Sequence, residues 1–243
     1  MTALLALIGL AAASEPEAAF PSSPPIGIDD AETVEAGHVE VNLTAGWSGR
    51  AEGWESEAPL VDGNLGLSDN VHINAEIPLV IQGGAGGLSA ALGNAAVACK
   101  VRILHRPGLQ LAIHPALDLP SFHQEPGATG EPLVLTLPAV VDAALGSGGL
   151  GLGAQLAHTW APSTGEHGWG AALGLAHPLG ETGVLMGDLT LETDGRLSPG
   201  EAWGELGYVR EGLFGREGLT LLSSAGLSVG GEAEALLGVQ LAR

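Results

Sequence analysis

The sequence predicts an all-β fold in which about 12 antiparallel strands run up and down and close into a barrel. Two observations lead to this fold class. Apolar residues alternate with polar ones, which is the period of a strand with two different faces, and the segment VEVNLTAGW at 39–47 shows this clearly. Gly, Pro, Asn, Asp and Ser separate the alternating segments, and these residues favour tight turns.

Twelve such segments follow one another from residue 37 onward. They lie at about 39–47, 55–67, 71–77, 95–103, 108–119, 132–144, 149–160, 167–177, 185–191, 201–210, 218–229 and 233–241. Near Pro59 the polar residues shift from odd-numbered to even-numbered positions, which predicts a β-bulge there. A long uncharged run from Ile77 to Cys99 contains five glycines at 83–93, so we expect two strands and a Gly-rich loop there instead of a spanning helix.

The connections between the segments are sorted by length. Counted from the first strand, the even-numbered ones are mostly tight, as at 68–70 and 106–108, whereas several odd-numbered ones are longer, notably 120–131 and 194–200. Short turns on one rim and longer loops on the other are typical of outer-membrane barrels, which also have an even number of strands. We therefore interpret the fold as a transmembrane barrel whose apolar face contacts lipid and whose polar face lines the lumen.

The N-terminal part of the chain predicts export. Residues 3–13 form an apolar stretch of signal-peptide length, which is too short to span a membrane as a helix. We expect a signal peptide at 1–14, an extended periplasmic lead-in at 15–36 and an outer-membrane barrel at 37–243.

Composition excludes several classes of partner and chemistry. The chain carries 28 acidic residues against 8 Lys and Arg, a net charge of −20, which argues against nucleic acid because phosphates need basic neutralisation. A single cysteine, Cys99, excludes an intramolecular disulfide and a thiolate zinc site. GSGGLG at 146–151 matches a dinucleotide fingerprint, but alternation continues through it, so we interpret it as a hairpin turn. The eight histidines lack close metal-ligand spacing. We expect no catalytic residue, no cofactor and no metal.

The charged face of the strands supplies the candidate functional residues. Placed inward, it gives a set of lumen-lining residues that would set charge selectivity. They are Glu40, Asp62, Glu76, Lys100, Arg102, Asp118, Asp142, Asp188, Glu192, Glu205 and Glu234. Burying nine carboxylates in a dry core would cost several kcal/mol each, so water must reach them or they must pair. A wet acidic lumen would favour cations.

The tryptophans are candidates for a membrane-interface girdle, since Trp is enriched where a barrel meets the headgroups. The five are Trp47, Trp54, Trp160, Trp169 and Trp203, and four of them lie close to the longer loops. The alternative is that they are ordinary strand residues.

Several motifs in the first third of the chain resemble a bacterial family. These are IGIDDAETVEAGHVEVNL at 26–43, GWE at 53–55, LVDGNLGLSDNV at 60–71 and EIPLV at 76–80. They are similar to the putative outer-membrane proteins or transporters of the "MetA pathway of phenol degradation", over roughly residues 24–81. The resemblance implies a secreted β-barrel in the bacterial outer membrane and supplies no catalytic residues. The chain departs from such barrels at its end, GVQLAR, where they usually finish on an aromatic residue that the barrel-insertion machinery reads.

We expect a passive pore or binding conduit for a small solute, embedded in outer-membrane lipid, with the loop at 120–131 restricting its mouth. Two alternatives stay open: a non-conducting barrel with a structural or surface-recognition role, and a secreted soluble β-sandwich or lipid-binding barrel. An enzyme is not expected.

Overall fold

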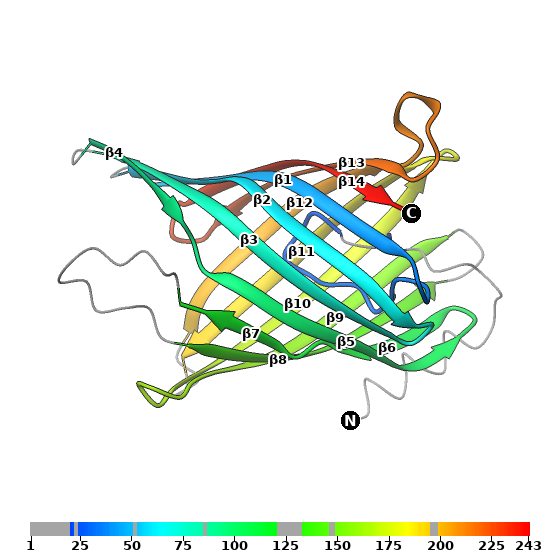
Figure 1. The fold of residues 1–243 in the computed structure, drawn as a ribbon, viewed down its shortest axis with the longest axis horizontal. Helices are drawn as coiled ribbons and strands as arrows, with labels where there is room; N and C mark the ends of the chain where they lie inside the picture. The colour runs from blue at the N-terminus through cyan, green and yellow to red at the C-terminus, as the bar shows by residue number, and fades with distance from the viewer. Residues whose placement is uncertain are drawn as a thin grey trace.

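The computed structural model describes residues 20–21, 24–50, 53–84, 87–120, 133–145, 149–194 and 199–243. In this part of the chain the strands form one antiparallel sheet that closes on itself, because the first strand pairs with the last (Figure 1). The strands are β1 (Val39–Arg50), β2 (Gly53–Ser68), β3 (Val71–Gly84), β4 (Gly87–Leu92), β5 (Ala95–Arg106), β6 (Leu109–Ile113), β7 (Ala116–Leu119), β8 (Val134–Leu145), β9 (Leu150–Ala161), β10 (Glu166–Leu179), β11 (Gly183–Asp194), β12 (Pro199–Arg210), β13 (Leu219–Ser228) and β14 (Ala233–Ala242). A short 3-10 turn, η2 (Leu213–Gly215), joins β12 to β13. No helix among the described residues is long and apolar enough to cross a membrane.

Two of the barrel strands are interrupted. β3 pairs with β4 at one end and with β5 at the other, so β4 and β5 are two parts of a single barrel strand. β6 and β7 are related in the same way, since both pair with β5 and with β8. Pro115 lies in the gap between β6 and β7, where it is tolerated because it cannot donate a ladder hydrogen bond. The barrel therefore has twelve strands, which confirms the prediction, and the two-layer sandwich alternative is wrong.

Two local predictions are confirmed as well. The register between β2 and β3 shifts between Glu57 and Leu60, which places a bulge at Pro59. The uncharged run from Ile77 onward divides between β3, which ends at Gly84, and β4, which begins at Gly87.

The two faces of the strands differ in burial as the alternation predicts. On β1, Val39, Val41 and Leu43 are 38–48% exposed on the outside, whereas Glu40 and Asn42 between them are 5% and 4% exposed on the inside. Large exposed apolar side chains recur on the other long strands. An apolar belt of this extent is expected where a barrel faces lipid.

Residues 24–36, which we call the luminal segment, lie inside the barrel (Figure 1, dark blue). We expected an extended periplasmic lead-in at 15–36, and residues 24–36 of it lie inside the barrel instead. Ile28 is 1% exposed and packs in a buried apolar cluster with Met186 on β11 and Val209 on β12. Burial of this apolar side of the segment against the wall is favourable, because it removes apolar area from the water of the lumen.

A charged side chain on the outer face should destabilise the barrel according to its depth. Leu189 is 67% exposed near the middle of β11, and we expect Leu189→Arg to lower the free energy of unfolding in lipid vesicles by about 2–4 kcal/mol. Leu88, 75% exposed at the start of β4, close to the rim, is the matched control, for which Leu88→Arg should cost about 0–1 kcal/mol. Urea titrations of both variants in vesicles measure this, and equal losses would contradict the lipid-facing assignment.

Candidate functional site

The luminal segment is attached to the barrel wall by a buried ion-pair cluster. Lys100 on β5 is 3% exposed, and its Nζ lies 2.9 Å from Asp29 Oδ1 and 3.2 Å from Asp30 Oδ2. His114 Nδ1, in the gap between β6 and β7, donates to Asp29 Oδ2 at 2.6 Å. Burial by itself would raise the pKa of Asp29, but Lys100 and His114 outweigh it and hold this pKa well below its ordinary value. Asp29 is therefore a carboxylate, and the cluster compensates its charge.

Backbone groups of the luminal segment are held by side chains of the wall. The Asp29 N–H donates to Gln155 Oε1 at 2.8 Å, and the Ala31 N–H donates to Asp142 Oδ2 at 2.6 Å. On the other side, the Val34 N–H donates to His72 Nδ1 at 3.1 Å. These bonds satisfy the backbone of a segment that belongs to no sheet, which is a requirement for burying it.

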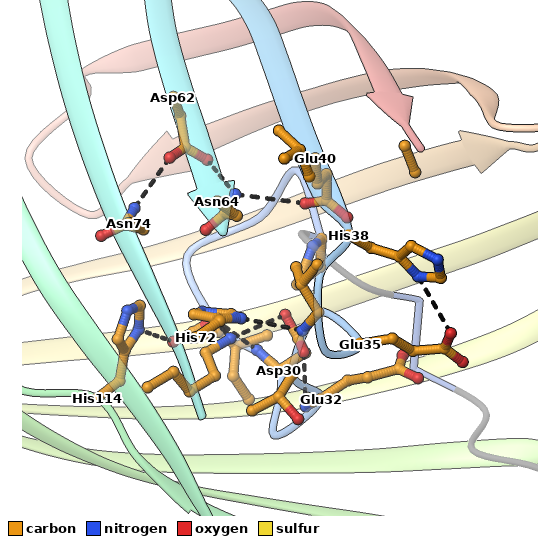
Figure 2. Close-up of a pocket in the computed structure, with 18 of the residues that line it drawn as sticks. Asp30, Glu32, Glu35, His38, Glu40, Asp62, Asn64, His72, Asn74 and His114 are labelled. Atoms are coloured by element: carbon orange, nitrogen blue, oxygen red, sulfur yellow. Dashed lines mark hydrogen bonds and ion pairs between the residues drawn. The ribbon is translucent and has the colours of Figure 1, made fainter. Parts of the chain in front are cut away.

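The wall formed by β1, β2 and β3 carries a second polar network (Figure 2). Asp62 accepts hydrogen bonds from the side-chain amides of Asn42 at 2.8 Å, Asn64 at 3.1 Å and Asn74 at 2.9 Å. The Asn42 and Asn64 amides also approach Glu40 Oε1 at 3.4 Å. These amides fix both carboxylates in position without neutralising them.

The luminal segment leaves two cavities beside this wall. The turn-side cavity, about 610 Å³, lies toward the rim where β1 begins and β14 ends, and Glu32, Glu40 and Asp62 are among its lining residues. The loop-side cavity, about 400 Å³, lies toward the opposite rim and is lined by four glutamates. They are Glu55, Glu57, Glu205 and Glu234. Residues 24, 26 and 27 border both cavities, so this part of the segment separates one from the other.

Gly27 passes close to the side of the wall formed by β11 and β12. A Cβ at this position would lie 2.9 Å from Thr190 Oγ1, 3.1 Å from Asp188 Oδ2 and 3.2 Å from Glu205 Oε2. A larger residue would therefore collide with the wall, and the backbone can pass here because glycine has no side chain.

All eleven residues predicted to line the lumen lie on the inner face. Asp142, Asp188 and Glu205 contact the luminal segment, and Glu40, Asp62 and Lys100 line the turn-side cavity. The others are placed inward by register or by cavity contacts. They are Glu76 opposite Asp62, Arg102 opposite Ala112, Asp118 opposite Ala96, Glu192 beside Thr190 in a further cavity, and Glu234 in the loop-side cavity.

The tryptophans do not all share one face. Trp47, Trp54, Trp160 and Trp169 are 39–44% exposed on the outside, at the end of the barrel that carries the longer loops. Trp203 lies opposite Thr190 and shares its face with Glu205, so it points into the lumen. That position departs from the girdle of five that we expected.

The sequence interpretation did not single out the asparagine amides or the inward histidines His72 and His114. It also did not place residues 24–36 inside the barrel. His72, Asn64 and Asn74 do occupy inward positions of the alternation, which was the available signal. The predicted signal peptide at 1–14 lies outside the described residues, and so does the loop at 120–131 apart from its first residue.

The barrel has the fold of bacterial outer-membrane channels. The COG4313 outer membrane channel from Pseudomonas putida F1 matches it with a TM-score of 0.69 and 11% identity, over 90% of this chain and 100% of that one. The NanC porin matches with a TM-score of 0.60 and 8% identity, over 83% and 98%. The KdgM porin in complex with disordered oligogalacturonate matches with a TM-score of 0.58 and 7% identity, again over 83% and 98%. At these identities the likeness shows the fold.

No protein-family model matches the chain, and neither does any curated protein sequence. Membership of the phenol-degradation family is therefore not shown.

Removing the buried cation should release the luminal segment. Loss of one partner from a buried ion pair costs about 3–5 kcal/mol, because the other charge is left uncompensated. We expect Lys100→Met to accelerate amide hydrogen exchange at residues 29–34, measured by mass spectrometry. Adding Asp29→Asn and Asp30→Asn to this variant should restore much of the protection, because the cluster is then neutral. Unchanged exchange in Lys100→Met would contradict the role of the cluster.

Glu32 should titrate near neutrality. Burial and the neighbouring charge of Asp30 raise the pKa of Glu32 from 4.5 to about 7. The native protein thus keeps a proton there that the unfolded chain releases above its ordinary pKa, so this contribution to stability is lost as the pH rises through 7. Isotope-edited infrared spectroscopy should give a midpoint near 7, and Glu32→Gln should flatten the pH dependence of unfolding between 4.5 and about 7. A midpoint at the ordinary value would refute the assignment.

Proposed function

We propose that the protein is a passive outer-membrane channel or binding conduit for small solutes, with an acidic lumen that favours cations. The single observation that carries the proposal is the pair of acidic cavities that lie one beyond the other along β1, β2 and β14. The fold supports it, since the COG4313 protein is described as a channel and NanC and KdgM as porins.

The position of the luminal segment determines where a solute would pass. Its apolar side packs on β10 to β13, and its charged side is bonded to β5, β8 and β9. The space that remains lies along β1, β2 and β14, where both cavities are found. A solute that follows this wall meets Glu57 and Glu234 from the loop side and Asp62 and Glu40 from the turn side. Field lines from these carboxylates are focused by the low-dielectric barrel, which raises the local concentration of cations.

The remaining parts of the proposal rest on the sequence. They comprise outer-membrane localisation after export by the peptide at 1–14, insertion by the barrel-insertion machinery and membership of the phenol-degradation family. The apolar outer face and the four exposed tryptophans at one rim support the membrane placement.

A non-conducting barrel is the second candidate, and the luminal segment is the observation that favours it. If residues 24–36 stay bonded to the wall, the two cavities do not join and the barrel binds a solute without passing it. Single-channel recording in planar bilayers separates the two functions. A folded barrel that never conducts would leave only the binding role.

Charge removal in the loop-side cavity should weaken cation preference. We expect Glu55→Gln with Glu234→Gln to lower the cation-to-anion permeability ratio by a factor of about two to ten, because two of four lining carboxylates are lost. Reversal potentials across a salt gradient measure this ratio.

The matched control removes two charges from exposed positions, one at the start of β10 and one in the turn between β10 and β11. Glu166→Gln with Glu181→Gln should leave the reversal potential unchanged. A similar shift in both double variants would mean that net charge, and not the lumen, sets the preference.

A further inference from the structure

Two histidines lie side by side on the outer face of the barrel, close to the rim that carries the longer loops. His158 is near the end of β9 and His167 is near the start of β10. Each has the parity of an exposed tryptophan on its own strand, Trp160 or Trp169, so both point outward. His158 Nε2 lies 3.3 Å from His167 Nδ1. We call these two residues the rim histidine pair.

The hairpin of β9 and β10 brings the pair together. Each histidine lies opposite a tryptophan of the other strand, so the two imidazoles are diagonal neighbours. A tight turn fixes this register, since the Gly165 N–H donates to Ala161 O at 2.8 Å. The sequence interpretation rejected metal binding because the histidines lack close spacing along the chain. Antiparallel pairing supplies the proximity that the spacing lacks.

Neighbouring tryptophans position the two imidazoles. The ring centroids of His158 and Trp169 are 4.7 Å apart. Those of His167 and Trp160 are 6.2 Å apart, with 8° between the ring planes. Contacts on both rings restrict their side-chain rotamers, so the pair loses little conformational freedom when it binds a ligand.

The distance between the two nitrogens is that of two ligands on one tetrahedral metal ion. Imidazole nitrogens lie about 2.0–2.1 Å from zinc, so two of them in a tetrahedral site are about 3.3 Å apart. Adjacent ligands of a square-planar ion such as Cu²⁺ would be closer, at about 2.9 Å for the same bond length. The remaining ring nitrogens, His158 Nδ1 and His167 Nε2, make no hydrogen bond within the described part of the chain. Each can therefore carry the ring proton while the other nitrogen binds the metal.

The site is open and supplies two protein ligands. No group of three His, Cys, Asp or Glu side chains among the described residues is arranged to hold a metal, so water would complete the coordination. His167 is exposed and His158 is half-buried. The adjacent tryptophans are 40–41% exposed, as in an aromatic belt at the level of the headgroups, where water and ions reach the protein.

We infer that the rim histidine pair binds one Zn²⁺ ion through His158 Nε2 and His167 Nδ1. A bound ion would cross-link β9 to β10 beside the turn that joins them. The site lies on the outside of the barrel, so the inference goes beyond the proposed function and does not rest on it.

Calorimetric titration of the detergent-purified full chain with Zn²⁺ tests the inference. His158→Gln and His167→Gln should each weaken binding about tenfold or more, because one imidazole is left and the loss of a group that only orients a ligand already costs about 10–100-fold. His177→Gln is the matched control, since it removes an exposed histidine of the outer face at the opposite end of β10. This control should bind Zn²⁺ as the unmodified protein does.

Mg²⁺ distinguishes the imidazoles from the many carboxylates of the chain. Mg²⁺ prefers oxygen ligands, so it should not compete for the pair, whereas Zn²⁺ held by carboxylates would be displaced. Long-range ¹H–¹⁵N correlation spectra of histidine-labelled protein identify the nitrogens that bind. On addition of Zn²⁺, the resonances of His158 Nε2 and His167 Nδ1 should shift together.

The outcomes separate the metal site from a simple hydrogen bond and from the channel function. Equal Zn²⁺ affinity in the unmodified protein and both variants, or no shift at these two nitrogens, would overturn the inference and leave the pair hydrogen-bonded only. Heat-modifiable migration on a gel shows that each variant has folded. Zn²⁺ binding by both histidines of a barrel that never conducts would support the site and remove only the channel function.

Discussion

Closure of the barrel is the constraint on which the rest of the structure depends. Ten residue pairs join β1 to β14, from Glu40 opposite Ala242 to Gly49 opposite Ala233. Once the sheet is closed, every second side chain must point into the enclosed lumen and the others must point outward. Leu43 and its neighbours are thereby turned outward and Glu40 inward, so the acidic lumen follows from closure and from the strand period together.

The luminal segment packs against two different parts of the inner wall, one apolar and one charged. Its apolar residues, with Ile28 at the centre, pack where Met186 and Val209 form an apolar patch inside the barrel. Its acidic residues lie where Lys100 supplies the buried positive charge. The wall supplies the partner that a buried charge needs and the acceptors that buried backbone N–H groups need. Together these contacts place the segment against one side of the lumen and leave the β1–β2 wall free.

The carboxylates in the lumen have different roles, because only some of them contact the luminal segment. Asp142 is bonded to the backbone of the luminal segment, so its role is to hold that segment. Asp62 is held by asparagine amides and faces a cavity, so its charge acts on whatever enters. The same residue type thus anchors the segment on one wall and attracts solute on the other. The difference comes from the donors that surround each carboxylate.

The sequence by itself determined the number of strands, the bulge at Pro59 and the inward position of residues such as Glu76 and Asp188. It could do so because strand alternation is local, and a residue's face depends on its neighbours one and two positions away. Trp203 was predicted to lie at the membrane interface. Its position in the alternation instead puts it on the same face as Glu205, inside the barrel. Only the tertiary structure decided where residues 24–36 lie. Their partners are distant in sequence, with Lys100 71 positions from Asp29 and Asp142 111 positions from Ala31, and a segment without regular period carries no local signal of such contacts.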